Sequence, residues 1–160
     1  MTLAAAAFAG PRLLAQSPAP SSAAPSVPNR GPQIESARAK EFVVAGHGNL
    51  DKVKEMLAAQ PAIVNATWDW GGGDFEAALG GASHMGRPDI AEVLLASGAR
   101  LDVFAAAMLG KLDVVKAAVA AFPDIVNVPG PHMIPLIAHA QKGGAMPVVE
   151  FLSSLAPKKP

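Results

Sequence analysis

The sequence predicts an all-α protein made of about four stacked helix-turn-helix units. Hydrophobic residues make up 51% of the chain, alanine dominates them, and tyrosine is absent. Such a composition suits closely packed helices better than sheets, which favour aromatic and β-branched residues. A template of small apolar helix, glycine and second helix recurs along the chain. The segment Ala58–Asn65 also returns as Ala120–Asn127, identical at six of eight positions, which indicates internal duplication.

The N-terminal residues are predicted to lie outside this fold. Residues 1–16 contain a short alanine-rich apolar stretch with a plausible cleavage point after Ala15, and they resemble a twin-arginine export signal from its hydrophobic region onward. The stretch is far shorter than the about 20 residues that span a bilayer. We expect an exported, periplasmic protein; the alternative is a disordered tail on a cytoplasmic one. Residues 17–32 are rich in Pro, Ser and Ala and predict a disordered linker, residues 33–156 form the repeat domain, and 157–160 a tail.

Four units can be followed along the repeat domain. Their inter-helix turns are expected at Gly48, Gly86, Gly110 and Gly144. Apolar residues at helical spacing, such as Val53, Met56 and Leu57, give each second helix one stripe that a neighbouring unit must cover. The interval between the second and third turns is short, so we expect the third unit to lack the finger that precedes the others.

Three short motifs resemble those of ankyrin repeats. Gly110–Lys116 is similar to the turn between the family's two helices, Leu94–Ala99 to the end of its second helix, and Ile134–Leu136 to its Thr-Pro-Leu opening. The resemblance covers roughly residues 37–155. It implies an ankyrin-repeat solenoid whose concave face and projecting fingers bind another protein.

Composition and motifs argue against several other functions. Thirteen basic and thirteen acidic residues cancel, so the chain has no net charge with which to attract nucleic acid. There is no cysteine for thiolate chemistry, and no serine stands in a Gly-x-Ser-x-Gly setting. Gly71–Gly73 lacks the Lys-Ser/Thr of a phosphate loop and is interpreted as a flexible finger. We therefore expect no catalysis and no cofactor.

The four histidines are His47, His84, His132 and His139, and no two of them share a helix face at metal-binding spacing. A metal site would require convergence over long sequence distances, so none is predicted. His47 is interpreted as a polar group at a turn, whereas His84 and His139 are expected to make structural hydrogen bonds in first helices.

The segment from Trp68 to Glu76 is the strongest candidate for a binding surface. It contains both tryptophans, is acidic, and falls where a finger should project. Exposed tryptophan beside carboxylates suits an interface; alternatively, the tryptophans fold back and fill space. The predicted partner-binding residues are Trp68, Asp69, Trp70, Asp74, Phe75, Glu76, His84, His132 and Met133.

Three functions remain open at this stage. The leading one is a non-catalytic module, monomeric, that binds an unknown protein partner and neither nucleic acid nor membrane. The alternative is a metal- or small-ligand-binding protein, or a minor enzyme, that uses Asp69, Asp74, Glu76 and His84. The third is a structural spacer tethered through residues 17–32.

Overall fold

The computed structural model describes residues 31–155, and all of its helices and strands lie in the compact unit that begins at Gln33. Residues 1–30 and 156–160 are outside the described part. The expected signal segment (1–16), most of the linker (17–32) and the tail (157–160) fall there, so these assignments remain predictions.

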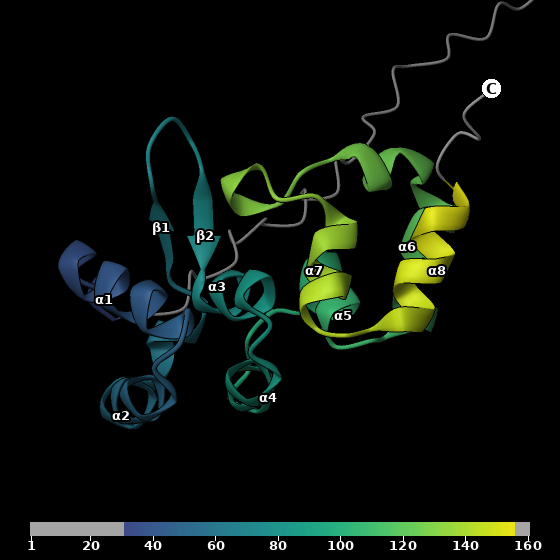
Figure 1. The fold of residues 1–160 in the computed structure, drawn as a ribbon. Helices are drawn as coiled ribbons and strands as arrows, with labels where there is room; N and C mark the ends of the chain where they lie inside the picture. The colour runs from purple at the N-terminus through teal and green to yellow at the C-terminus, as the bar shows by residue number, and fades with distance from the viewer. Residues whose placement is uncertain (1–30, 156–160) are drawn as a thin grey trace, which may run out of the picture. The chain divides into compact units, whose positions relative to one another are not determined.

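The described part of the chain is predominantly helical, as expected (Figure 1). None of its helices is long and apolar enough to cross a membrane. The α-helices are α1 (Ser36–Gly46), α2 (Leu50–Ala59), α3 (Ala78–Met85), α4 (Pro88–Ala96), α5 (Val103–Met108), α6 (Leu112–Ala121), α7 (Leu136–Lys142) and α8 (Met146–Leu155). Short 3₁₀ turns form η1 (Pro61–Asn65), η2 (Pro123–Asn127) and η3 (Pro131–Met133).

The structure is compatible with the expected all-α class, and the small sheet among the described residues is the first finger, which forms a β-hairpin. Strands β1 (Thr67–Asp69) and β2 (Phe75–Ala77) pair antiparallel, with Trp68 opposite Glu76. The turn between them contains three glycines with positive φ, a conformation that glycine adopts without steric cost. Asp69 Oδ1 accepts hydrogen bonds from Gly71 N and Gly73 N, at 2.8 and 3.2 Å, which closes the turn.

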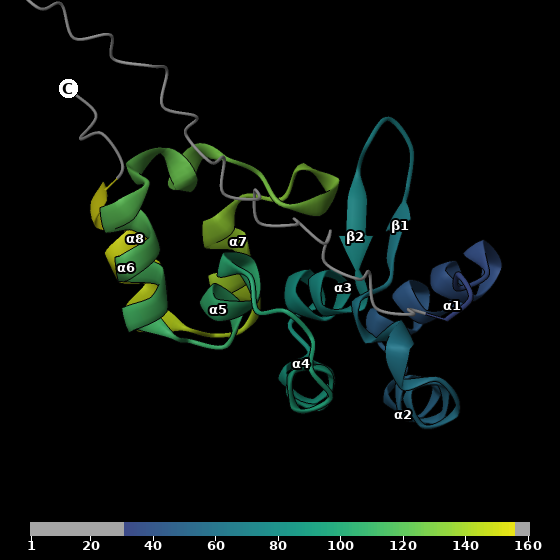
Figure 2. The ribbon, with the colours of Figure 1, turned by 180° about the vertical axis from the view of Figure 1, so that it is seen from behind.

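The helices pack as consecutive pairs. The first helices form a row in which α1 packs on α3, α3 on α5 and α5 on α7, and each also packs on the helix that follows it in the chain. Figures 1 and 2 show this row from opposite sides, with the hairpin beside α3. α1 and α3 approach closely at Gly46, where a Cβ atom would lie 2.5 Å from the carbonyl oxygen of Ala78. The predicted stripe of Val53, Met56 and Leu57 is buried in this packing.

The duplicated segments have the same local structure. Each forms the end of a second helix followed by a 3₁₀ turn, α2 with η1 and α6 with η2. Asn65 closes the first copy, because its side-chain amide donates to the carbonyl oxygen of Gly98 at 3.1 Å and its Oδ1 accepts from Arg100 N at 2.9 Å. These bonds join the first helix pair to the loop that leaves the second. Only residues 97–102 connect α4 to α5, and no finger projects there.

Candidate metal centre

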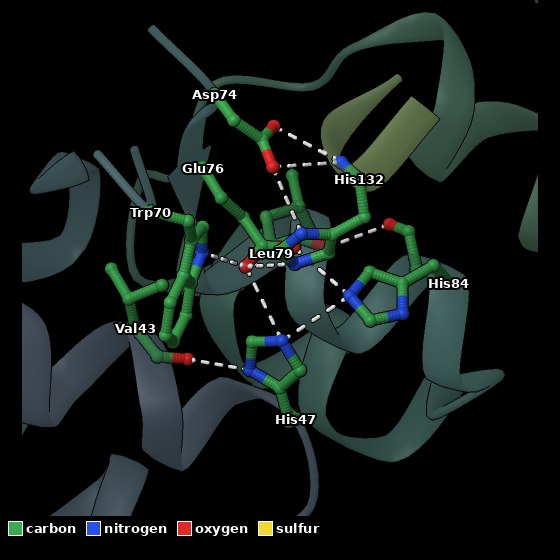
Figure 3. Close-up of polar contacts among 9 residues, drawn as sticks. Val43, His47, Trp70, Asp74, Glu76, Leu79, His84 and His132 are labelled. Atoms are coloured by element: carbon green, nitrogen blue, oxygen red, sulfur yellow. Dashed lines mark hydrogen bonds and ion pairs between the residues drawn. The ribbon is translucent and has the colours of Figure 1, made fainter. Parts of the chain in front are cut away.

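Three histidines and one glutamate converge beneath the hairpin, although they are far apart in the sequence. His47 follows α1, Glu76 lies on β2, His84 lies on α3 and His132 lies in η3 (Figure 3). One potential ligand atom from each residue lies within 4.8 Å of the others. The structure therefore brings about the long-range convergence that histidine spacing did not predict.

The distances within this cluster are those of a small coordination cage. The Nε2 atoms of His47 and His84 are 3.2 Å apart. Glu76 Oε2 lies 3.2 Å from His47 Nε2 and 3.3 Å from His132 Nε2, while Oε1 lies 3.0 Å from His84 Nε2. Zinc bonds of about 2.0–2.1 Å in a tetrahedron place neighbouring ligand atoms roughly 3.3 Å apart. The space that the four groups surround is therefore close in size to one that holds a single metal ion.

Two of the imidazoles are oriented by bonds from their other nitrogen. His47 Nδ1 lies 3.0 Å from the carbonyl oxygen of Val43, which can only accept, so Nδ1 carries a proton. His132 Nδ1 lies 2.9 Å from Asp74 Oδ2. Metal-binding histidines commonly donate their second N–H to a carbonyl or carboxylate in this way, which directs the free lone pair of Nε2 at the ion.

The cluster requires a positive charge at its centre. Glu76 is 1% exposed, and its Oε2 accepts a hydrogen bond from Trp70 Nε1 at 2.8 Å. No hydrogen bond of ordinary geometry reaches Oε1 within the described residues, although His84 Nε2 is close to it. Carboxylate and imidazole lone pairs that face one another repel unless a proton or a metal ion lies between them. Either a proton or a metal ion can remove this repulsion in the present arrangement of side chains.

The pKa values of the metal-free cluster show how protons can supply this positive charge. Burial would raise the pKa of Glu76, but its polar contacts with His47, His84 and Trp70 outweigh burial and hold that pKa far below its usual range. The contact with Glu76 raises the pKa of His47, and burial opposes this only in part. Without a metal, Glu76 is therefore ionised and His47 attracts a proton.

Local backbone geometry explains how these side chains reach one place. Alternation along β2 turns Glu76 inward and leaves Phe75 exposed. Gly81 on α3 makes room for His47, because a Cβ atom there would lie 2.7 Å from His47 Nδ1. Without a side chain at residue 81, the imidazole can lie against α3 and reach Glu76.

The η3 turn holds its histidine in an uncommon conformation. His132 and Met133 have φ values of 57° and 58°, in the left-handed region that non-glycine residues seldom occupy. The Asp74 carboxylate accepts the backbone N–H of His132 at 3.0 and 3.2 Å and also contacts its ring. Strained backbone that is held by specific bonds clusters at functional sites. Asp74 therefore both fixes this turn and orients His132.

The residues of the predicted alternative site divide into two groups. Asp74, Glu76 and His84 come together, whereas Asp69 stays in the hairpin turn that it closes. His47 was interpreted as a turn group and His132 as a partner contact, yet both join the cluster. A usable signal lies in the repeat itself. His47 stands one residue before the turn glycine Gly48 and His84 stands two residues before Gly86, so both lie at the ends of first helices that pack on each other.

The aromatic residues that were predicted to bind a partner differ in their surroundings. Trp70 covers the cluster, with its ring centroid 5.9 Å from that of His47 and 5.6 Å from that of His132. Trp68 has the ammonium of Lys40 5.0 Å above its ring. Trp70 thus packs over the cluster and is still 38% exposed, whereas Trp68 is partly buried. Phe75 and Met133 remain 62% and 77% exposed.

No protein-family model matches this chain, and no curated protein matches it. The geometry of the site is therefore the basis for its function.

The substitution Gly81→Ala tests whether the position of His47 matters for metal binding. The added methyl group would lie 2.7 Å from His47 Nδ1 and push the ring away from Glu76, so the metal-free protein should lose the stability that this pair provides. Zinc affinity, measured by calorimetry, should fall by at least tenfold because one ligand is displaced. Gly48→Ala is the control, since a Cβ atom there meets only Arg87 Nη1, at 3.5 Å. Equal zinc affinity in both variants would contradict the assignment of His47.

The pKa shifts predict how the stability of the metal-free protein depends on pH. A raised pKa for His47 stabilises the fold below about pH 6.5, and this contribution is lost as pH rises through the folded-state value. A lowered pKa for Glu76 stabilises the fold above its usual 4.5 and is lost in acid. Urea titrations in chelator should therefore give a free energy of unfolding that falls on both sides of this interval.

Glu76→Gln should weaken the pH dependence of the free energy of unfolding on both the acidic and the basic side of this interval. Burial lowers the pKa of His139 and adds an opposite slope, which wild type and variant share apart from the smaller, opposing effect of the Glu76 charge on that pKa. With zinc present, the stability of the wild type should instead rise with pH, because the ligands must lose protons to bind the ion. Identical pH profiles for wild type and Glu76→Gln in chelator would refute the charge pairing.

Proposed function

We propose that this chain binds one divalent transition-metal ion through His47, Glu76, His84 and His132. The observation that carries the proposal is the convergence of three imidazole Nε2 atoms on one buried carboxylate, 3.0 to 3.3 Å from its oxygens and with one ligand atom from each residue within 4.8 Å of the others. Asp74 and the carbonyl oxygen of Val43 contact the Nδ1 atoms of His132 and His47 and so orient two of the three imidazoles.

Three nitrogen ligands and one oxygen ligand favour zinc among the available ions. Imidazole is a good ligand for zinc, copper, iron and nickel, whereas calcium and magnesium prefer all-oxygen sites. Zinc also accepts a tetrahedral set without electronic preference. Affinity alone would rank copper above zinc, so metal availability decides the ion that is bound in the cell.

Four protein ligands make this a closed site. Catalytic zinc usually keeps one position for water, whereas structural zinc is held by four side chains. The proposed ion would tie α1, β2, α3 and η3 together, and it supports a protein without catalytic activity. Its main effect would be to hold the hairpin and the η3 turn against the helix row.

Zinc titration of the full chain, after removal of bound metal, tests this function. We expect one ion per chain by calorimetry and by mass spectrometry under native conditions. Glu76→Gln and His84→Ala should each weaken binding at least tenfold, because each removes a ligand. Glu55→Gln is the matched control, since Glu55 is an exposed partner of Lys52. Wild-type protein that takes up no zinc, copper or nickel would rule out the proposal.

A second function, binding of a protein partner, is favoured by a groove beside the metal centre. The groove measures about 670 Å³ and lies between the hairpin turn and the η3 loop. It is lined by Gly71, Gly72, Gly73, Asp74, Phe75, Phe104, Pro129, Gly130, Pro131 and Met133. The exposed Phe75 and Met133 offer apolar area of the kind that forms the core of an interface. We propose these two residues as the main anchors for a partner.

The double variant Phe75→Ser/Met133→Ser tests the partner surface. A protein captured by the zinc-loaded wild type should be lost by this variant, while zinc affinity stays unchanged because neither side chain is a ligand. Val44→Ser/Met85→Ser removes exposed apolar side chains on α1 and α3 and serves as the control. Equal capture by all three proteins would exclude the groove as the binding surface.

The arrangement of helix pairs supports the proposal that the unit is of ankyrin-repeat type. Consecutive first helices stack in a row, each helix pair is joined through a short turn, and a hairpin projects between the first and second pairs. Such stacks present their fingers and first helices as a binding face. Both the metal centre and the groove involve these elements.

A further inference from the structure

The fourth histidine is buried without a complete set of hydrogen bonds. His139 on α7 is 0% exposed. Its Nδ1 donates to the carbonyl oxygen of Pro135 at 3.1 Å, as expected for a structural histidine, so Nε2 is left as an acceptor. Nε2 has no hydrogen-bond partner among the described residues. An acceptor buried without a partner destabilises the fold, so packing alone gives no reason for an imidazole here.

His139 lies directly behind the proposed metal centre. Its ring centroid is 6.5 Å from that of His84, with the two planes at 87°, and 4.9 Å from that of Phe104. It also packs beneath the residue that leads into η3, because a Cβ atom on Gly130 would lie 3.3 Å from His139 Cε1. The side chain therefore contacts the surroundings of two ligands, His84 and His132.

His84 is the one ligand whose second nitrogen lacks an acceptor. His47 has the carbonyl of Val43 and His132 has the carboxylate of Asp74. The Nε2 atom of His84 faces Glu76, so its proton must reside on Nδ1 when Nε2 binds a metal. Within the part of the chain that the structure describes, no protein atom accepts this proton. The ring of His84, whose Nδ1 has no protein acceptor among the described residues, thus neighbours the ring of His139, whose buried Nε2 has no donor.

We propose that His139 is a positioning residue for the metal centre and that its Nε2 accepts the Nδ1–H of His84 through one buried water molecule. A centroid separation of 6.5 Å excludes a direct hydrogen bond of about 2.9 Å between the two rings, and one water molecule can bridge it where the two nitrogens face each other. A buried water commonly links polar groups that lack protein partners. The bridge fixes the tautomer and the rotation of His84. This inference rests on the proposed metal binding.

The test compares zinc affinity and metal-free stability in His139→Leu and His139→Gln. In the leucine variant the acceptor is lost, so the dissociation constant for zinc should rise 10- to 100-fold. Its metal-free melting temperature should stay unchanged or increase, because an unpaired buried group is gone. The glutamine variant carries a carbonyl oxygen that can accept, and it should recover much of the affinity. Leu136→Met, one turn earlier on α7, controls for altered packing and should bind zinc as the wild type does.

Nitrogen-15 NMR of the zinc-loaded wild type gives a second measurement that does not require any variant to fold. We expect His84 to carry its proton on Nδ1, protected from exchange and with a cross-peak to bound water, and His139 Nε2 to be unprotonated. His139→Leu with unchanged zinc affinity, or a proton on His139 Nε2, would overturn the positioning role while leaving metal binding intact. Absence of zinc binding by the wild type would overturn both.

Discussion

The buried carboxylate of Glu76 is the constraint on which this structure depends. A charge removed from water costs several kcal/mol unless nearby groups compensate for it. Here the compensating groups are three imidazoles and the indole N–H of Trp70, which come from separate segments of the chain. The hairpin, the ends of two first helices and the η3 turn must therefore stay together. This requirement holds whether protons or a metal ion supply the positive charge.

Helix repetition explains how residues so far apart in the sequence meet at this carboxylate. The packing of α1 on α3 brings His47 beside His84, and the hairpin between the first two helix pairs carries Glu76 above them. His132 arrives differently. Because α4 and α5 are joined without a finger, space remains beside the hairpin, and the η3 loop extends into it until Asp74 binds His132. The irregular third unit thus contributes to the site.

The sequence was informative about what local patterns determine. Helical spacing predicted the buried stripe of Val53, Met56 and Leu57, and the two echoed segments fold alike. It was less informative where structure depends on distant contacts. Strands of three residues around a glycine turn are too short to leave a periodic signal. The sequence therefore predicts a projecting finger here but not its β-hairpin structure. Histidines on different units share no helix face, and their meeting depends on how the units stack.

The metal centre and the groove share parts, which links the two proposed functions physically. Asp74 lines the groove and at the same time orients the ligand His132 and fixes the left-handed η3 turn. Met133, the most exposed apolar side chain of the groove, follows His132 directly in that turn. An ion bound to His132 would therefore hold both walls of the groove in place. A closed coordination sphere suits that role, because a site that shapes a surface gains from rigid ligands and has no need of an open position.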